Sequence, residues 1–123
     1  MEAWVYAVRG AITVDENTRE AIIESTKELI LEVCRENYIT DKSQVISVVF
    51  TSTSDLTAEF PAKAARTIGW TSVPLICARE LEIEGSMKSC IRLLMHFYSN
   101  VKNQEIKHIY LKDAKKLRPD LGE

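Results

Sequence analysis

The chain has 123 residues, which fits a single domain, and 46% of them are hydrophobic, enough for a core that needs no disulfide or metal to fold. A net charge of −2 and a pI near 5.8 lack the basic surplus that is typical of nucleic-acid binders. The 28% of charged residues and the absence of an apolar run approaching roughly 20 residues argue against a membrane protein.

The cysteines and histidines are too few and too scattered for a metal site. Cys34, Cys77 and Cys90 are odd in number, none of them pairs at C-x-x-C spacing, and His96 and His108 are the two histidines. Unpaired thiols favour a reducing compartment, and the first residues lack the basic flank and apolar run of a signal peptide. We therefore expect a cytoplasmic protein without a metal.

The first third of the chain predicts a strand followed by a long helix. Hydrophobic alternation over residues 4–9 indicates a strand that ends at Arg9, and Gly10 then lets the backbone turn or approach another chain closely. Residues 17–20 combine a cap residue with a glutamate three positions on, which is typical of a helix start. Apolar residues follow at helical spacing, and Asn37 suits the end of this helix.

The rest of the chain predicts four more strands and one short helix. Pro61 suits the first position of this helix, which Gly69 stops, and Pro119 argues against a helix near the end of the sequence. The strands are expected at residues 45–53, 73–79, 89–98 and 107–111, with a turn at residues 82–85.

The order of these elements predicts one α/β (α+β) domain over residues 1–123 with a mixed sheet. Strands joined by helices imply partly parallel pairing, and the last two strands fit an antiparallel pair. Two helices cover only one face of such a sheet. Because residues 89–98 carry apolar side chains on both faces, we expect a second subunit to cover the bare face.

The familiar catalytic motifs are missing: the sequence has no G-x-S-x-G, Walker loop, G-x-G-x-x-G or H-E-x-x-H. A Cys–His nucleophile pair that uses Cys77 or Cys90 stays open, although thiols in strands are more often packing residues. Arg92 is an unusual charge, because it lies in a mostly apolar strand and needs an anion or a carboxylate as partner. A structural ion pair with a glutamate and an anion-binding role both remain open.

Five further polar residues have ordinary surface or packing roles when each is taken alone. Arg9 and Glu80 end strands, Tyr110 lies in the last strand, and Lys63 and Arg66 lie one turn apart on the short helix. Several converging arginines suit a small dicarboxylate, since guanidinium matches carboxylate geometry. The residues alone do not identify which one.

Three segments of the sequence match the motifs of one enzyme family. Residues 8–14, VRGAITV, are similar to an R-G-A-x-T-V segment, and residues 53–66, TSDLTAEFPAKAAR, to a D-L-x-A-x-F-P-A-K-A-x-R stretch. The third segment runs from Val73-Pro74 through Cys77 and Glu80 to Arg92. Residues 108–111 and 117–121 follow in the expected order, so the resemblance covers nearly the whole chain. Each piece alone is weak, but in this combination the sequence resembles the trimeric chorismate mutases, and the combination is highly specific.

The resemblance implies a homotrimer with sheets inside as a central pseudo-barrel, helices outside, and active sites at subunit interfaces. It also implies an isomerase that converts chorismate to prephenate, on the way to phenylalanine and tyrosine. This Claisen rearrangement is unimolecular and needs no nucleophile, base, metal or cofactor. The enzyme has to restrict a flexible dianion to its reactive conformation and stabilise the charge that develops. The expected partners are chorismate and further copies of the chain, with no nucleic acid or membrane.

The resemblance assigns catalytic roles to three residues, Arg92, Glu80 and Arg9. Arg92 is expected to point at the ether oxygen, where negative charge develops. Arg9 and Tyr110 are expected to hold the side-chain carboxylate. Glu80 and the Cys77 backbone are expected to contact the ring hydroxyl, with Glu80 also facing the developing cationic ring. Because Cys77 and Glu80 lie three apart, the strand has to end or bulge between them.

The remaining residues are expected around the mouth of the site. Phe60 packs against the ring, and Lys63 and Arg66 guide the dianion in. Leu117 and Arg118 belong to a mobile tail, residues 112–123, that closes over the site. The sequence departs from the family pattern in three places. Ile76 lines the pocket where a small polar residue is expected, Arg79 stands where a neutral polar residue is more usual, and Gly85-Ser86 replaces what is often a pair of glycines.

Two other functions stay open beside this one. Reactive imine deaminases are also small α/β trimers with arginines at subunit interfaces, and fold likeness alone does not separate them from the mutases. A non-catalytic module would bind an aromatic-pathway acid without rearranging it. The F-P-A-K segment and the position of Arg92 favour the mutase.

Overall fold

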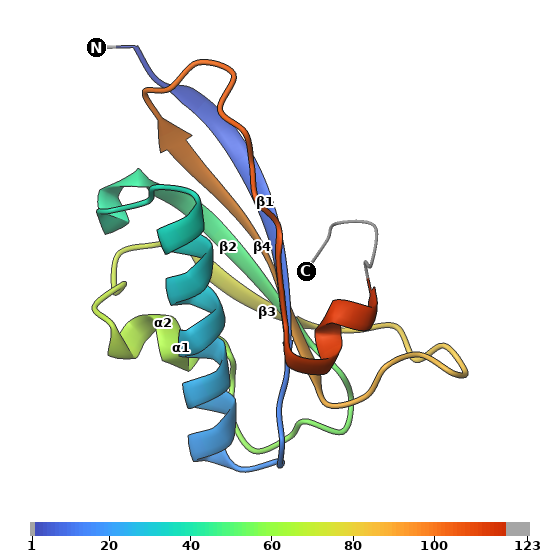
Figure 1. Ribbon diagram of the computed structural model, residues 1–123. Coiled ribbons are helices and arrows are strands. Elements are labelled where there is room, and N and C mark those ends of the chain that lie inside the picture. The colour runs from blue at the N-terminus through green and yellow to red at the C-terminus, as the bar shows by residue number, and fades with distance from the viewer. Residues whose placement is uncertain (1, 118–123) are drawn as a thin grey trace.

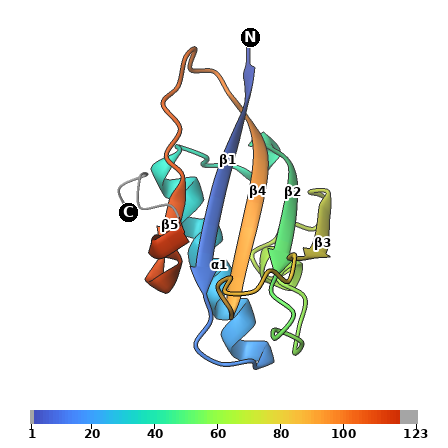
Figure 2. The same cartoon turned by 90° about the vertical axis from the view of Figure 1, so that its right-hand side faces the viewer.

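In the described part of the chain, five strands form one mixed sheet: β1 (Trp4–Thr13), β2 (Val45–Ser52), β3 (Leu75–Arg79), β4 (Cys90–Ser99) and β5 (Ile109–Leu111). Their order across the sheet is β3-β2-β4-β1-β5 in the computed structural model, which describes residues 2–117 (Figure 1, Figure 2). β4 runs antiparallel to both neighbours, β1 and β2, whereas β3 pairs parallel with β2 and β5 parallel with β1. The prediction of a mixed sheet is confirmed. No helix within residues 2–117 is long and apolar enough to cross a membrane.

The last two strands do not form the expected antiparallel pair. β5 pairs parallel with β1, and β1 separates it from β4. Both edges of β4 are already occupied, by β1 and β2, so β4 has no edge left for β5. The connection that leads into β5 is held instead at the end of the long helix, where the Asn37 side chain bonds to the backbone of Lys107 at 2.9 Å.

Two α-helices lie on one face of the sheet: α1 (Arg19–Glu36) and α2 (Ala62–Thr67) (Figure 1). α1 has Asn37 as its C-cap, which agrees with the predicted end near this residue, but its N-cap is Thr18, one residue later than expected. The Thr18 hydroxyl accepts a hydrogen bond from the amide of Ala21 at 3.1 Å. The amide group of Asn17 bonds instead to the loop that precedes α2.

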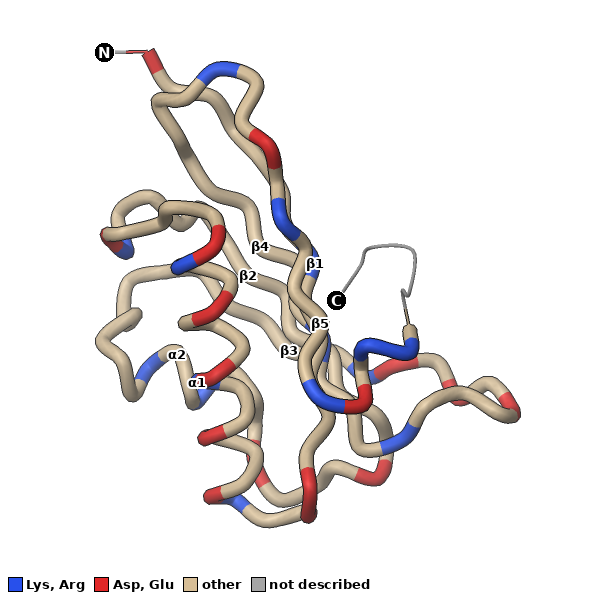
Figure 3. Tube along the Cα trace, in the orientation of Figure 1, with Lys and Arg blue, Asp and Glu red and all other residues tan. Residues whose placement is uncertain are grey.

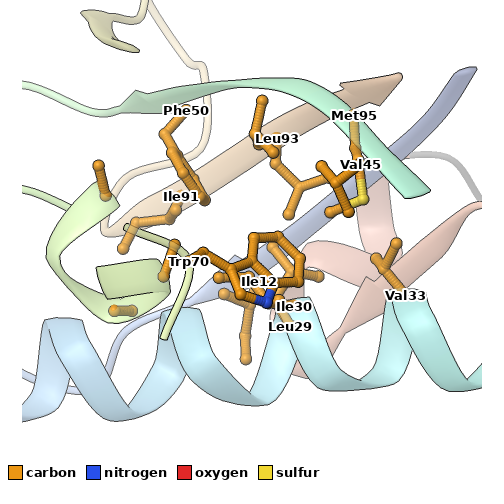
Figure 4. Packing of buried hydrophobic residues seen from close by; sticks show 14 of the residues in the cluster. Ile12, Leu29, Ile30, Val33, Val45, Phe50, Trp70, Ile91, Leu93 and Met95 are labelled. Atoms are coloured by element: carbon orange, nitrogen blue, oxygen red, sulfur yellow. The ribbon is translucent and has the colours of Figure 1, made fainter. Parts of the chain in front are cut away.

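The main core lies between the sheet and these helices (Figure 4). Gly10 lies inside β1 rather than in a turn, because the strand continues to Thr13. A Cβ at Gly10 would lie 3.1 Å from Leu29 and 3.2 Å from Val33, both of α1, and 3.3 Å from the carbonyl oxygen of Ile109. The close approach at Gly10 is thus to a helix and a strand of the same chain, and not to another chain as expected.

The other face of the sheet is largely bare within residues 2–117 (Figure 2). Its exposed large hydrophobic side chains are Val5, Ile76, Leu94 and Tyr98. The 3₁₀-helix η2 (Lys112–Leu117), which the sequence did not predict, lies on this side in Figure 1. It buries one corner of the sheet in a second small cluster of Ala11, Cys90, Tyr110 and Ala114. A second 3₁₀-helix, η1 (Lys42–Gln44), precedes β2. Residues 118–123 of the expected tail lie outside the described residues.

Candidate active site

A cavity of about 320 Å³ opens on the bare face of the sheet. Its polar lining comes from Arg9, Thr51, Glu80, Arg92 and Tyr110, and its apolar lining includes Val49 and Leu94. Four of the predicted site residues, Arg9, Glu80, Arg92 and Tyr110, therefore come together around one space. Figure 3 shows basic and acidic positions intermingled along the described chain, so these two arginines converge by folding and not because the sequence is basic.

Strand register explains this convergence. Arg92 of β4 lies opposite Thr51 in β2 and opposite Ala11 in β1, and Ala11 in turn lies opposite Tyr110 in β5. Arg9 lies two residues before Ala11, and side chains two apart in a strand share a face. Thr51, Arg92 and Tyr110 thus lie in a single row across the sheet, and Arg9 lies in the next row.

Glu80 is the first residue after β3, and its amide donates a hydrogen bond to the Ser52 carbonyl at 3.0 Å. Its carboxylate oxygen Oε2 lies 3.6 Å from Nε of Arg92, and the Thr51 hydroxyl donates to the same oxygen. The side chains of Arg92 and Glu80 are 45% and 23% exposed in the single chain. Arg92 thus lies within ion-pair distance of a glutamate, without closing a hydrogen-bonded pair, and is also open to the cavity, so the ion-pair and anion-binding interpretations are compatible.

Arg9 and Tyr110 approach the cavity from the edge that β5 forms. Arg9 is exposed, and its backbone amide donates to Nδ1 of His108 at 3.0 Å. Tyr110 is buried in the cluster beneath η2, and Leu117 packs against that cluster. Leu117 therefore lies near Tyr110, whereas Arg118 falls outside the described residues.

The other predicted residues lie elsewhere in the single chain. Phe60 and Cys77 line a separate cavity of about 240 Å³, and Lys63 and Arg66 belong to α2, on the helix-covered face. Ile76 is exposed, next to Val49 across the β2–β3 pair, on the bare face. One chain thus presents two groups of predicted residues, one on each side of the sheet.

Cys77 and Glu80 also lie on opposite sides. β3 ends at Arg79, between the two residues, as their spacing requires. The Cys77 side chain packs against the main core, so only its backbone is available to a ligand on the Arg92 side. Arg79 does not line the Arg92 cavity: its Nη1 donates to the carbonyl oxygens of Thr53 at 2.8 Å and Leu56 at 3.1 Å.

Two of the three thiols, Cys34 and Cys90, are unsuited to nucleophilic chemistry. Burial raises the pKa of Cys34 to about 12. Burial, together with Glu80, raises the pKa of Cys90 to about 11, although Arg92 opposes this shift. Both thiols are protonated at neutral pH, which favours the packing interpretation. Within residues 2–117, no group of three or more His, Cys, Asp or Glu residues is placed to hold a metal ion.

Sequence reasoning missed two residues that organise the site. Asp55 accepts hydrogen bonds from the amide and the hydroxyl of Ser89, both at 2.9 Å, directly before β4 begins. Burial works against its charge, but hydrogen bonds from Thr53 and Ser89 hold the pKa of Asp55 below its usual value. The other is Thr51, which no sequence signal sets apart, since Ser47 and Ser52 place hydroxyls in the same strand.

Comparisons with known proteins show the family to which the chain belongs. The model of the family described as chorismate mutase type I matches residues 5–121. The chorismate mutase AroH of Thermus thermophilus is 45% identical over 117 residues, which cover 95% of this chain and 96% of that protein. AroH of Bacillus subtilis is 40% identical over 119 residues, covering 96% of this chain and 93% of that protein.

The fold is also similar to that of a known chorismate mutase. A solved chorismate mutase from Clostridium thermocellum superimposes with a TM-score of 0.86 at 43% identity, covering 90% of this chain and 98% of that one. The similarity in fold and the similarity in sequence both extend over nearly the whole length of the chain, and they lead to one conclusion. The chain belongs to the type I chorismate mutase family.

Proposed function

We propose that the cavity around Arg92 is the place where this chain rearranges chorismate to prephenate. Membership of the family supports the reaction, and the observation that carries the location is the convergence of Arg9 and Arg92 on one cavity beside Glu80 and Tyr110. The substrate is a small dianion, and two guanidinium groups with a phenol suit its carboxylates. A biosynthetic step of this kind and three free cysteines support a cytoplasmic location.

The reaction requires that the substrate is held in its reactive conformation and that the charge developing in the transition state is stabilised. In the rearrangement the ether bond of chorismate breaks while a carbon–carbon bond forms, and every product atom comes from the substrate. Arg9 and Tyr110 hold the side-chain carboxylate and thereby keep the reacting ends together. Arg92 stabilises negative charge on the ether oxygen, and Glu80 faces the ring, where positive charge develops. The Cys77 backbone contacts the ring hydroxyl.

We further propose that the active site is completed by a second copy of the chain in a homotrimer. Phe60, Lys63 and Arg66 lie across the sheet from Arg92 within one chain, so they can join it only from a neighbour. The exposed apolar side chains of the bare face, among them Leu94, support burial of that face. With helices on the other face, the sheets then lie inside and the helices outside.

In this arrangement Phe60 of the neighbour packs against the ring, while Lys63 and Arg66 draw the dianion towards the mouth of the site. Ile76 lines the entrance, since it is exposed on the bare face. Leu117, together with Arg118, closes over the bound substrate. These roles follow the family pattern residue by residue.

The test is to incubate the purified chain with chorismate and follow the loss of its ultraviolet absorbance, with prephenate identified by NMR because the product has the same mass. Turnover with prephenate as product supports the proposal. Binding of chorismate without loss of absorbance would indicate a binding module. Hydrolysis of an imine without chorismate turnover would indicate a deaminase, and either result rejects the proposal.

A further inference from the structure

Glu80 has a demanding position in the proposed reaction, yet its side chain lies outside every strand. The residue follows the end of β3, and the hydrogen bond from its amide to Ser52 fixes only its backbone. A glutamate side chain has three rotatable bonds, so the carboxylate needs other partners to stay in one place. The partners in the structure are Thr51 and Arg92.

Thr51 is well suited to hold a carboxylate still. It lies in β2, which is paired on both edges, with Ala78 of β3 opposite on one side and Arg92 of β4 on the other. Its β-branched side chain has few rotamers, so the hydroxyl is held rigidly on the bare face beside the cavity. This hydroxyl donates to Oε2 of Glu80.

Arg92 approaches the same Oε2 atom, but only to 3.6 Å. A hydrogen-bonded guanidinium–carboxylate pair is closer, at about 2.7–2.9 Å. The separation therefore leaves Arg92 and Glu80 as neighbours rather than as a closed pair. A closed pair would direct the guanidinium at Glu80 and away from the substrate, and would also cancel much of the charge that each presents.

We infer that Thr51 is a positioning residue, whose hydroxyl holds the Glu80 carboxylate facing the cavity and apart from Arg92. The inference rests on the proposed function, because it concerns how well Arg92 and Glu80 stabilise the transition state. Without the hydroxyl, the Glu80 carboxylate moves to Arg92, and neither charged group is then directed at the substrate. Such a loss affects the transition state more than the bound substrate, so it lowers kcat more than it raises KM.

The experiment compares Thr51→Val, which keeps the shape and removes the hydroxyl, with Thr51→Ser, which keeps the hydroxyl. A hydrogen bond to a charged group is worth enough to predict a fall in kcat of about 10-fold or more for Thr51→Val. We expect KM to change by less than about 3-fold, and Thr51→Ser to retain most of the activity. Ser47→Ala is the matched control, because Ser47 lies on the same strand and face, opposite His96 rather than Arg92.

A double mutant identifies the partner through which Thr51 acts. When Thr51→Val is added to Glu80→Ala, we expect kcat to fall by less than about 3-fold further, because the carboxylate to be positioned is already gone. Circular dichroism verifies folding, and Thr51→Ala replaces the valine variant if that one does not fold.

The outcomes separate the proposed function from the inference about Thr51. No turnover by the wild-type chain, or full activity of Glu80→Ala, rejects the proposed function or the role of Glu80. The inference about Thr51 alone is overturned in two cases, provided that the wild-type chain is active and Glu80→Ala is impaired. In the first, the kcat of Thr51→Val stays within about 2-fold of wild type. In the second, the effects of Thr51→Val and Glu80→Ala on kcat are additive.

Discussion

The side chain of Asn37 joins the end of α1 to the segment that leads into β5, and its removal has a predictable effect on stability. Asn37 is 1% exposed. Its Nδ2 donates to the carbonyl oxygens of Val33 and Lys107, and its Oδ1 accepts from the amide of Lys107, all at 2.9 Å. In an Asn37→Ala variant the Val33 carbonyl keeps the backbone amide of residue 37 as a donor, at 3.2 Å. The two groups left without these partners are the N–H and C=O of Lys107.

The magnitude follows from those two groups. A buried polar group without a partner costs about 1–3 kcal/mol, and both bonds to Lys107 are only partly buried, so the lower part of this range applies to each. We expect Asn37→Ala to lower the free energy of unfolding by about 2–3 kcal/mol. This is a large share of the roughly 5–15 kcal/mol of a typical domain.

Asn17 offers a matched control, because its amide also makes three hydrogen bonds, at 2.9–3.0 Å, to the backbone and side chain of residues 57–58. These bonds are exposed, so water replaces them, and Asn17→Ala is expected to cost about 0.5–1 kcal/mol. Both variants are unfolded in urea at one protein concentration, since an oligomer's stability depends on concentration. Equal losses for the two variants would refute the argument that burial sets the difference.

Three further predictions concern the site, the core and the bare face. Arg92→Lys is expected to lower kcat by about 100-fold or more while circular dichroism stays unchanged, because an ammonium cannot reproduce the planar donor; near-normal kcat would remove Arg92 from the mechanism. Gly10→Ala is expected to lower the free energy of unfolding by about 1–3 kcal/mol, since the new Cβ lies 3.3 Å from the backbone oxygen of Ile109; an unchanged urea midpoint would show that β5 moves away at no cost. Tyr98→Arg is expected to reduce the sedimenting mass and the turnover together, and a trimer that persists would mean that this part of the bare face is not an interface.

The helices and strands were predictable where hydrophobic residues recur in the sequence with a clear helical or strand period. The long helix and most strands follow from helical spacing and alternation, and the bare sheet face follows from the two predicted helices, which cover only one face. The pairing of β5 was not predictable, because it depends on which edges are free and on the bonds between Asn37 and Lys107. No local pattern encodes these long-range contacts.

The site shows the same division. The sequence marked Arg92 as an awkward charge, but only the resemblance joined it to Arg9, Glu80 and Tyr110, and only the register explains why they meet. Thr51 had no distinguishing signal, since a threonine is common in strands and its meaning comes from its neighbours. Roles that depend on a second copy of the chain are the least visible in one sequence, because no contact within the chain records them.

Assembly and catalysis depend on the same surface in the proposed trimer. In the single chain the Arg92 side chain is 45% exposed, and water weakens any charge that it presents to a substrate. A fixed guanidinium stabilises a developing anion far more strongly in a site from which water is excluded. The apolar side chains around the cavity, such as Val49 and Leu94, form part of such a site, but one chain leaves it open on one side. A neighbour that covers the bare face would close it and would also bring Phe60, so the surface that drives association would be the one that makes Arg92 effective.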